Sequence, residues 1–203
     1  MTNTSANAMI EKFEDLLRST CREGIDNVIE QLKSLGFYTA PASTKFHLAE
    51  AGGLLKHSLN VCTAALSLRE QTEQIVPDIL PQLPRESVII AALLHDVCKA
   101  DIYKNAIVSK RREDGFWEKV NGYTADYSHL PLGHGEKSVI MLLSWGLKLT
   151  DEEMVAIRWH MTAWDLPFQS PESKANLEAA KARTPLCGLI QCADSFASNI
   201  MER

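Results

Sequence analysis

The sequence lacks the features of membrane-spanning, disulfide-stabilised and broadly nucleic-acid-binding proteins. No stretch approaches the roughly 18 consecutive apolar residues of a membrane span, and the first residues form neither a basic segment nor an apolar run. The five cysteines are odd in number and have no CxxC spacing, which argues against a disulfide framework or a zinc ribbon. The formal net charge of −5 argues against an extended nucleic-acid surface. We therefore expect a cytoplasmic protein with reduced thiols and no membrane contact.

Apolar side chains recur at helical spacing through most of the 203 residues, and this pattern predicts an all-α protein. The 45% hydrophobic and 23% charged content suits one domain with a sizeable core. We expect a disordered polar tail over residues 1–8 and a single domain over residues 9–203. Thr150 and Glu153 form a predicted capping box, and Thr184 with Pro185 predicts the start of the last helix.

Residues 103–123 are the exception, because two β-prone segments flank a charged stretch that ends in Asp-Gly. This pattern predicts a small β-hairpin insertion. The segment is the most basic part of an acidic chain, and aromatic residues alternate with its cations. It is either a solvated hairpin or a flap that binds phosphate oxygens and stacks on a base. In the second interpretation the substrate-binding residues are Lys104, Arg111, Trp117 and Tyr123.

One apolar segment, residues 86–99, presents His95 and Asp96 side by side. A helix that is apolar all round is buried, and an unpaired carboxylate is costly in such surroundings. Asp96 is therefore expected to bind a cation or to form half of a buried ion pair. Neighbouring positions on a helix point about 100° apart, so a metal held by both residues takes its other ligands from other helices.

Other predicted helices offer similar side chains. His57 lies on the apolar stripe of residues 54–70, where it is either a hydrogen-bonded core histidine or a ligand. Asp194 lies in mid-helix, where it cannot act as an N-cap and so requires a cation or a strong donor. His134 begins one helix, and His160 shares a face with apolar residues in another. Imidazole and carboxylate ligands without thiolates favour Mn, Fe, Co, Ni or Zn at an open catalytic site.

The order His57, His95-Asp96, Asp194 resembles the HD-domain superfamily of metal-dependent phosphohydrolases. Residues 52–57 (Gly-Gly-Leu-Leu-Lys-His) and 93–99 (Leu-Leu-His-Asp-Val-Cys-Lys) are the segments most similar to the family. The resemblance implies a compact multi-helix HD-domain bundle in which these four residues bind one metal ion. By their order, His134 and His160 fit a second ion. The implied cofactors are one or two divalent transition-metal ions (Mn, Fe, Co, Ni or Zn), with or without Mg.

The resemblance implies hydrolysis of a phosphomonoester or phosphodiester bond by a metal-activated water, with a nucleotide or related small phosphoester as partner. Asp96 and Lys99 are the expected catalytic residues. Lys99 either neutralises developing charge in the cleft or lies on the surface at a helix end. His47 and His129 are expected to be ordinary polar residues, although His47 is close enough to residues 52–53 to touch substrate. The alternatives are a catalytically silent metal- or nucleotide-binding module and a di-iron HD-type oxygenase.

Overall fold

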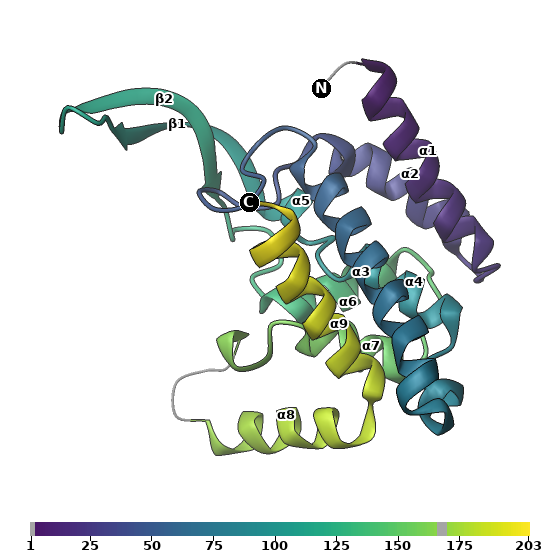
Figure 1. Ribbon diagram of the computed structural model, residues 1–203. Coiled ribbons are helices and arrows are strands. Elements are labelled where there is room, and N and C mark those ends of the chain that lie inside the picture. The colour runs from purple at the N-terminus through teal and green to yellow at the C-terminus, as the bar shows by residue number, and fades with distance from the viewer. Residues whose placement is uncertain (1–2, 166–169) are drawn as a thin grey trace.

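Helices are the main secondary structure of the computed structural model, which describes residues 3–165 and 170–203 (Figure 1). The α-helices are α1 (Asn3–Ser19), α2 (Ile25–Leu35), α3 (Gly53–Ile75), α4 (Arg85–Leu94), α5 (Lys99–Ile102), α6 (His134–Ser144), α7 (Asp151–Trp159), α8 (Pro171–Arg183) and α9 (Pro185–Phe196). Short 3-10 turns are η1 (Phe37–Thr39), η2 (Pro77–Gln82) and η3 (Thr162–Asp165), and η4 (Ala197–Met201) is a π-helical turn. Within the described residues the only strands are β1 (Tyr103–Arg111) and β2 (Trp117–Ala125), so the predicted all-α bundle with a hairpin is confirmed.

The centre of the bundle consists of α3, α4, α7 and α9. α3 packs against α4 and α9, while α7 packs against α4, α6 and α9. Every residue of α4 from Ser87 to Leu94 is buried, as expected for a helix that is apolar all round. In Figure 1, α1 and α2 lie to one side of this centre and α8 crosses its lower end. Among the described helices, none combines the length and apolar character that crossing a membrane requires.

Two helix starts follow the predicted capping signals. α7 begins after Thr150, whose hydroxyl accepts a hydrogen bond from the backbone N–H of Glu153, while the Glu153 carboxylate accepts from the backbone N–H of Thr150. The buried Glu153 also receives two hydrogen bonds of 2.7 Å from Arg22. α9 begins at Pro185, directly after Thr184.

Two predicted boundaries were wrong. α1 begins at Asn3, so residues 3–8 continue the helix instead of forming a tail; once a helix is nucleated, each added residue gains a backbone hydrogen bond. The helix that was expected to reach Lys99 ends at Leu94. The reason is that the His95 side chain donates to the carbonyl of Ala92 (2.9 Å), the acceptor that the next backbone N–H would otherwise use. Tight turns with i to i−3 bonds follow, such as Lys99 N–H to the Asp96 carbonyl at 3.0 Å.

The hairpin projects from the bundle as a two-stranded ribbon (Figure 1). Its antiparallel register runs from Tyr103 opposite Ala125 to Arg111 opposite Trp117, and Gly115 takes the positive φ of +88° that the turn requires. Side chains alternate between the two faces of a strand. The register therefore places Arg111, Trp117 and Tyr123 on one face of the ribbon and Lys104 on the other.

Candidate metal centre

The six predicted ligand residues meet at one place, although they come from five segments of the chain. They are His57 from α3, His95 and Asp96 after α4, His134 at the start of α6, His160 after α7 and Asp194 in α9, together called the His-Asp cluster. Within overlapping groups of three, their ligand atoms lie within 4.8 Å of one another. Glycine permits one of the close approaches: a Cβ on Gly135, next to His134, would collide with the backbone carbonyl of Arg158.

Asp96 lies between two pairs of histidines. Its Oδ2 is 3.4 Å from His57 Nε2 and 3.2 Å from His95 Nε2. Its Oδ1 contacts His134 Nε2 and lies 3.5 Å from His160 Nε2. The carboxylate thus presents one oxygen to each pair, so both pairs would share Asp96 if each held an ion.

His95 and His160 are oriented by the same kind of hydrogen bond to the backbone. Each follows the last residue of a helix, and its Nδ1 donates to the carbonyl three residues earlier, Ala92 at 2.9 Å and Ile157 at 2.7 Å. A carbonyl can only accept, so Nδ1 carries the proton and Nε2 is the nitrogen that faces the cluster.

His57 is oriented by Glu202, which the sequence analysis missed. The His57 Nδ1 is 3.0 and 3.1 Å from the two carboxylate oxygens of Glu202, whose side chain is fully buried. Asn60 donates to the same carboxylate at 3.0 Å. Such carboxylate–histidine pairs fix the tautomer and ring orientation of metal ligands, here with His57 Nε2 directed at the cluster, 3.3 Å from Asp194 Oδ1.

These donor atoms fit a metal ion. His57 Nε2 and His95 Nε2 are 3.3 Å apart among carboxylate oxygens, which is close enough for both to be ligands of one ion. His160 Nε2 is buried and has no hydrogen-bond partner within the described part of the chain. Buried polar atoms normally have a partner, and imidazole and carboxylate donors without thiolates suit divalent transition metals.

The charges of the cluster follow from burial and from its partners. Burial tends to raise the pKa of Asp96, but Lys99 and the neighbouring histidines outweigh it and hold that pKa well below its usual range. Burial also tends to lower the pKa of His57, but hydrogen bonds with Asp194, Asp96 and Glu202 raise it to about 10. For His160, burial dominates and lowers the pKa. Asp96 is therefore an anionic donor and His160 a neutral one.

A cavity of about 210 Å³ adjoins the cluster, and His47, Lys99, His160 and Asp194 belong to its lining. Lys99 is buried, with its Nζ 2.5 Å from Asp96 Oδ2, so its ammonium group faces the cavity and not the surface. His47 lies beside the cluster: its ring centroid is 5.1 Å from that of His57, and its Nε2 is buried without a hydrogen bond to the described residues. His129 is 76% exposed and bonds Asp101 at 2.9 Å, as expected for a surface residue.

The other predicted site residues lie elsewhere. Lys104, Arg111, Trp117 and Tyr123 are on the projecting hairpin and do not line the cavity beside the cluster (Figure 1). The structure therefore does not bring them together with the His-Asp cluster.

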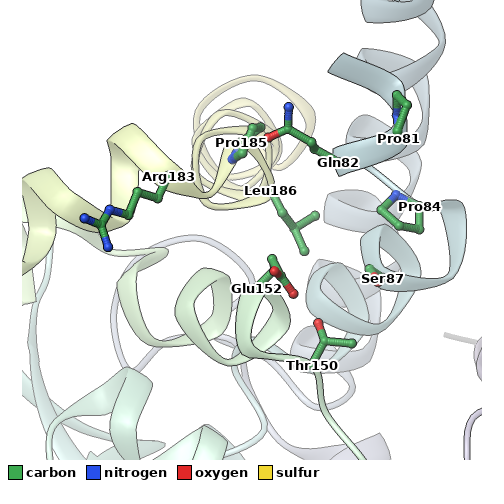
Figure 2. A pocket seen from close by; sticks show the side chains of 9 residues that line it. All are labelled: Pro81, Gln82, Pro84, Ser87, Thr150, Glu152, Arg183, Pro185 and Leu186. Carbon is green, nitrogen blue, oxygen red and sulfur yellow. The ribbon is translucent and has the colours of Figure 1, made fainter. Parts of the chain in front are cut away.

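A larger cavity, about 310 Å³, lies at the opposite end of α4, where Ser87 belongs to its lining (Figure 2). Its titratable groups are Glu152 and Arg183, and Figure 2 shows Arg183 directed away from Glu152. Among the described residues that line it, none is a histidine or an aspartate. This cavity has no group of side chains comparable with the cluster.

Comparison with known proteins identifies the family. The HD domain family model matches residues 54–199, and the chain belongs to this family. A protein of Methanocaldococcus jannaschii named dihydroneopterin 2′,3′-cyclic phosphate phosphodiesterase is 32% identical over 97 residues. The match covers 48% of this chain and 34% of that relative, so it spans only a minor part of the relative's length. No solved structure matches the chain.

Proposed function

We propose that the protein is a metal-dependent phosphohydrolase that cleaves a phosphoester bond of a nucleotide or a related small phosphoester. The observation that carries the proposal is the position of Asp96, with one oxygen toward His57 and His95 and the other toward His134 and His160. Membership of the HD domain family and the name of the archaeal relative, a phosphodiesterase, support it.

We infer that the cluster holds one or two divalent ions from the group Mn, Fe, Co, Ni and Zn, with or without Mg. His57, His95, Asp96 and Asp194 would hold one ion, while His134 and His160 would share Asp96 to hold a second. When bound, such ions lower the pKa of a coordinated water and neutralise charge on a phosphoryl group.

The chain itself contributes charge and shape. Asp96 and Lys99 are the proposed catalytic residues, the first as a shared ligand and the second as a buried ammonium group that offers a donor to a non-bridging phosphoryl oxygen. The cavity of about 210 Å³ is smaller than the roughly 300–1,000 Å³ of pockets for drug-sized ligands, which favours a small substrate. A cyclic phosphodiester, the substrate class in the relative's name, is the first to test. The expected cytoplasmic location stays a prediction.

The test compares two histidine variants, His95→Ala within the cluster and His129→Ala on the surface. Elemental analysis of metal-replete protein is combined with a phosphoester panel that includes nucleoside 2′,3′-cyclic phosphates. We expect metal binding and hydrolysis in the wild type and in His129→Ala, and loss of both in His95→Ala. Stoichiometric metal without hydrolysis of any phosphoester would contradict the proposal and favour a binding module. Two iron ions with oxygen consumption would instead indicate oxidative chemistry.

A further inference from the structure

The cavity beside the cluster has a second wall that contains no proposed metal ligand. One part of it is the segment around η3, and the other is the polar face of α9 and η4. Its lining residues are Met161, Thr162 and Trp164 from the first part and Gln191, Ser195, Ser198 and Asn199 from the second. These residues face the same space as Lys99 and Asp194.

On the α9 part of this wall, two polar side chains have no partner among the described residues. Ser198 donates to the backbone carbonyl of Asp194 at 2.9 Å, and the Asn199 amide donates to the carbonyl of Ser195 at 2.9 Å. The Gln191 amide and the Ser195 hydroxyl make no such bond within the described ranges. Gln191 precedes Asp194 by three residues, which places it about 4.5 Å further along the helix axis. A group bound at Gln191 would therefore be next to a phosphoester held at the cluster.

Trp164 completes the wall with an aromatic surface. It lines the cavity although 89% of the residue is exposed. An indole offers a large flat apolar face, and nucleic-acid bases stack on such faces in proteins. The glutamine amide presents a donor and an acceptor side by side, the pattern with which it reads the edge of a heterocyclic base.

We propose that this wall is a subsite for a planar nitrogen heterocycle joined to the phosphoester, with Trp164 stacking on the ring and Gln191 bonding its edge. The proposal rests on the proposed phosphohydrolase function and specifies its substrate class. The cavity of about 210 Å³ suits one ring system and not a chain of nucleotides.

The test uses the full chain loaded with Mn²⁺ and two kinds of substrate. The first is the set of four nucleoside 2′,3′-cyclic phosphates, and the second is glycerol 1,2-cyclic phosphate, which has no ring system beyond the phosphoester. Gln191→Leu and Trp164→Ala are compared with Cys192→Ser, an exposed position on α9 that does not line the cavity. We expect each cavity variant to lower kcat/KM for the best nucleoside substrate about tenfold, as for the loss of one good contact. Turnover of the glycerol substrate should stay unchanged in all variants.

A binding measurement separates this proposal from the proposed function. Calorimetry with the corresponding nucleoside 3′-monophosphate requires no turnover, and we expect the dissociation constant to rise about tenfold in Gln191→Leu and Trp164→Ala. If no phosphoester, including the glycerol compound, is hydrolysed, the phosphohydrolase proposal fails, while weaker nucleotide binding in these variants still supports the subsite. Equal binding by the wild type and both variants, or equal losses on ring-containing and glycerol substrates, would overturn the subsite.

Discussion

The His-Asp cluster and the hairpin both contain residue types that favour phosphoester chemistry, but the fold constrains them differently. In the cluster, the rings of His57, His95 and His160 are buried, and a second partner fixes each ring through Nδ1. On the hairpin, Trp117 is 69% exposed, and the ribbon projects from the bundle (Figure 1). The comparison indicates that polar residues on buried helix faces predict where a site lies in the fold. Basic and aromatic residues on an exposed ribbon show only that the segment contains suitable residue types, not that it belongs to the site.

The largest effect is expected from Asp96→Ala. The change removes the carboxylate that both histidine pairs face, so we expect loss of stoichiometric metal and of phosphoester hydrolysis. In the metal-free protein it also leaves the Lys99 ammonium buried without its 2.5 Å partner. Breaking a buried ion pair costs about 3–5 kcal/mol, so the free energy of unfolding should fall by this amount in urea titrations followed by circular dichroism.

Two variants control the Asp96 experiment. Asp78→Ala removes an exposed carboxylate on η2 and should change the free energy of unfolding by less than about 0.5 kcal/mol. Asp96→Ala combined with Lys99→Met removes both charges and should regain part of the lost stability but no metal. Normal metal content in Asp96→Ala would contradict the proposed ligand set.

The pH dependence of metal binding should show the next largest effect. In the metal-free protein the pKa of His57 is raised to about 10 by hydrogen bonds to Asp194, Asp96 and Glu202 that outweigh burial. The stability from this raised pKa is fully present below the unfolded-state value of 6.5 and is lost as pH rises through about 10. A metal must displace this proton, so apparent metal affinity should rise about tenfold per pH unit between 6.5 and 10.

Thermal unfolding with Mn²⁺ and with EDTA checks the sign of this effect. With EDTA, stability should fall as pH rises across the window, and the additional stability given by Mn²⁺ should grow. A stabilisation by Mn²⁺ that is independent of pH would show that the ion binds without displacing a proton from His57.

Glu202→Gln should have a smaller effect on the cluster. The amide keeps the size of the side chain but removes the charge that accepts from His57 Nδ1. Loss of such a supporting carboxylate typically weakens metal binding 10–100-fold, which metal titration in a competing chelator measures. The exposed Glu178→Gln on α8 is the matched control and should bind metal normally. Wild-type metal affinity in Glu202→Gln would show that the Glu202 carboxylate does not support His57 in metal binding and only holds residues near η4 in place.

The difference between Asp194 and Glu202 shows what could be predicted from the sequence. Asp194 interrupts an apolar helical stripe, so the pattern alone predicts that it faces the interior, and its side chain is 17% exposed beside His57. Glu202 follows a π-helical turn, where α-helical spacing no longer applies, and it is 145 positions from His57. The predicted end of α4 was wrong for a related reason. The His95 side chain, and not a backbone N–H, donates to the carbonyl of Ala92, and the helix propensities of the residues do not predict such a bond. His47 lies in an irregular segment whose path depends on tertiary packing.

The smallest effect is expected on the hairpin, where the triple variant Lys104→Ala, Arg111→Ala, Trp117→Ala removes three exposed side chains. Their predicted role in substrate binding requires the ribbon to reach the cavity, which these residues do not line. We expect unchanged metal content and a change in kcat/KM within about twofold, the equivalent of the ±0.5 kcal/mol typical of surface substitutions. Steady-state kinetics on the best phosphoester substrate measure this change. A rise in KM of more than about tenfold with normal metal content would show that the hairpin closes over bound substrate. In that case the ribbon and the cluster would form one site, and the contrast between them would hold only without substrate.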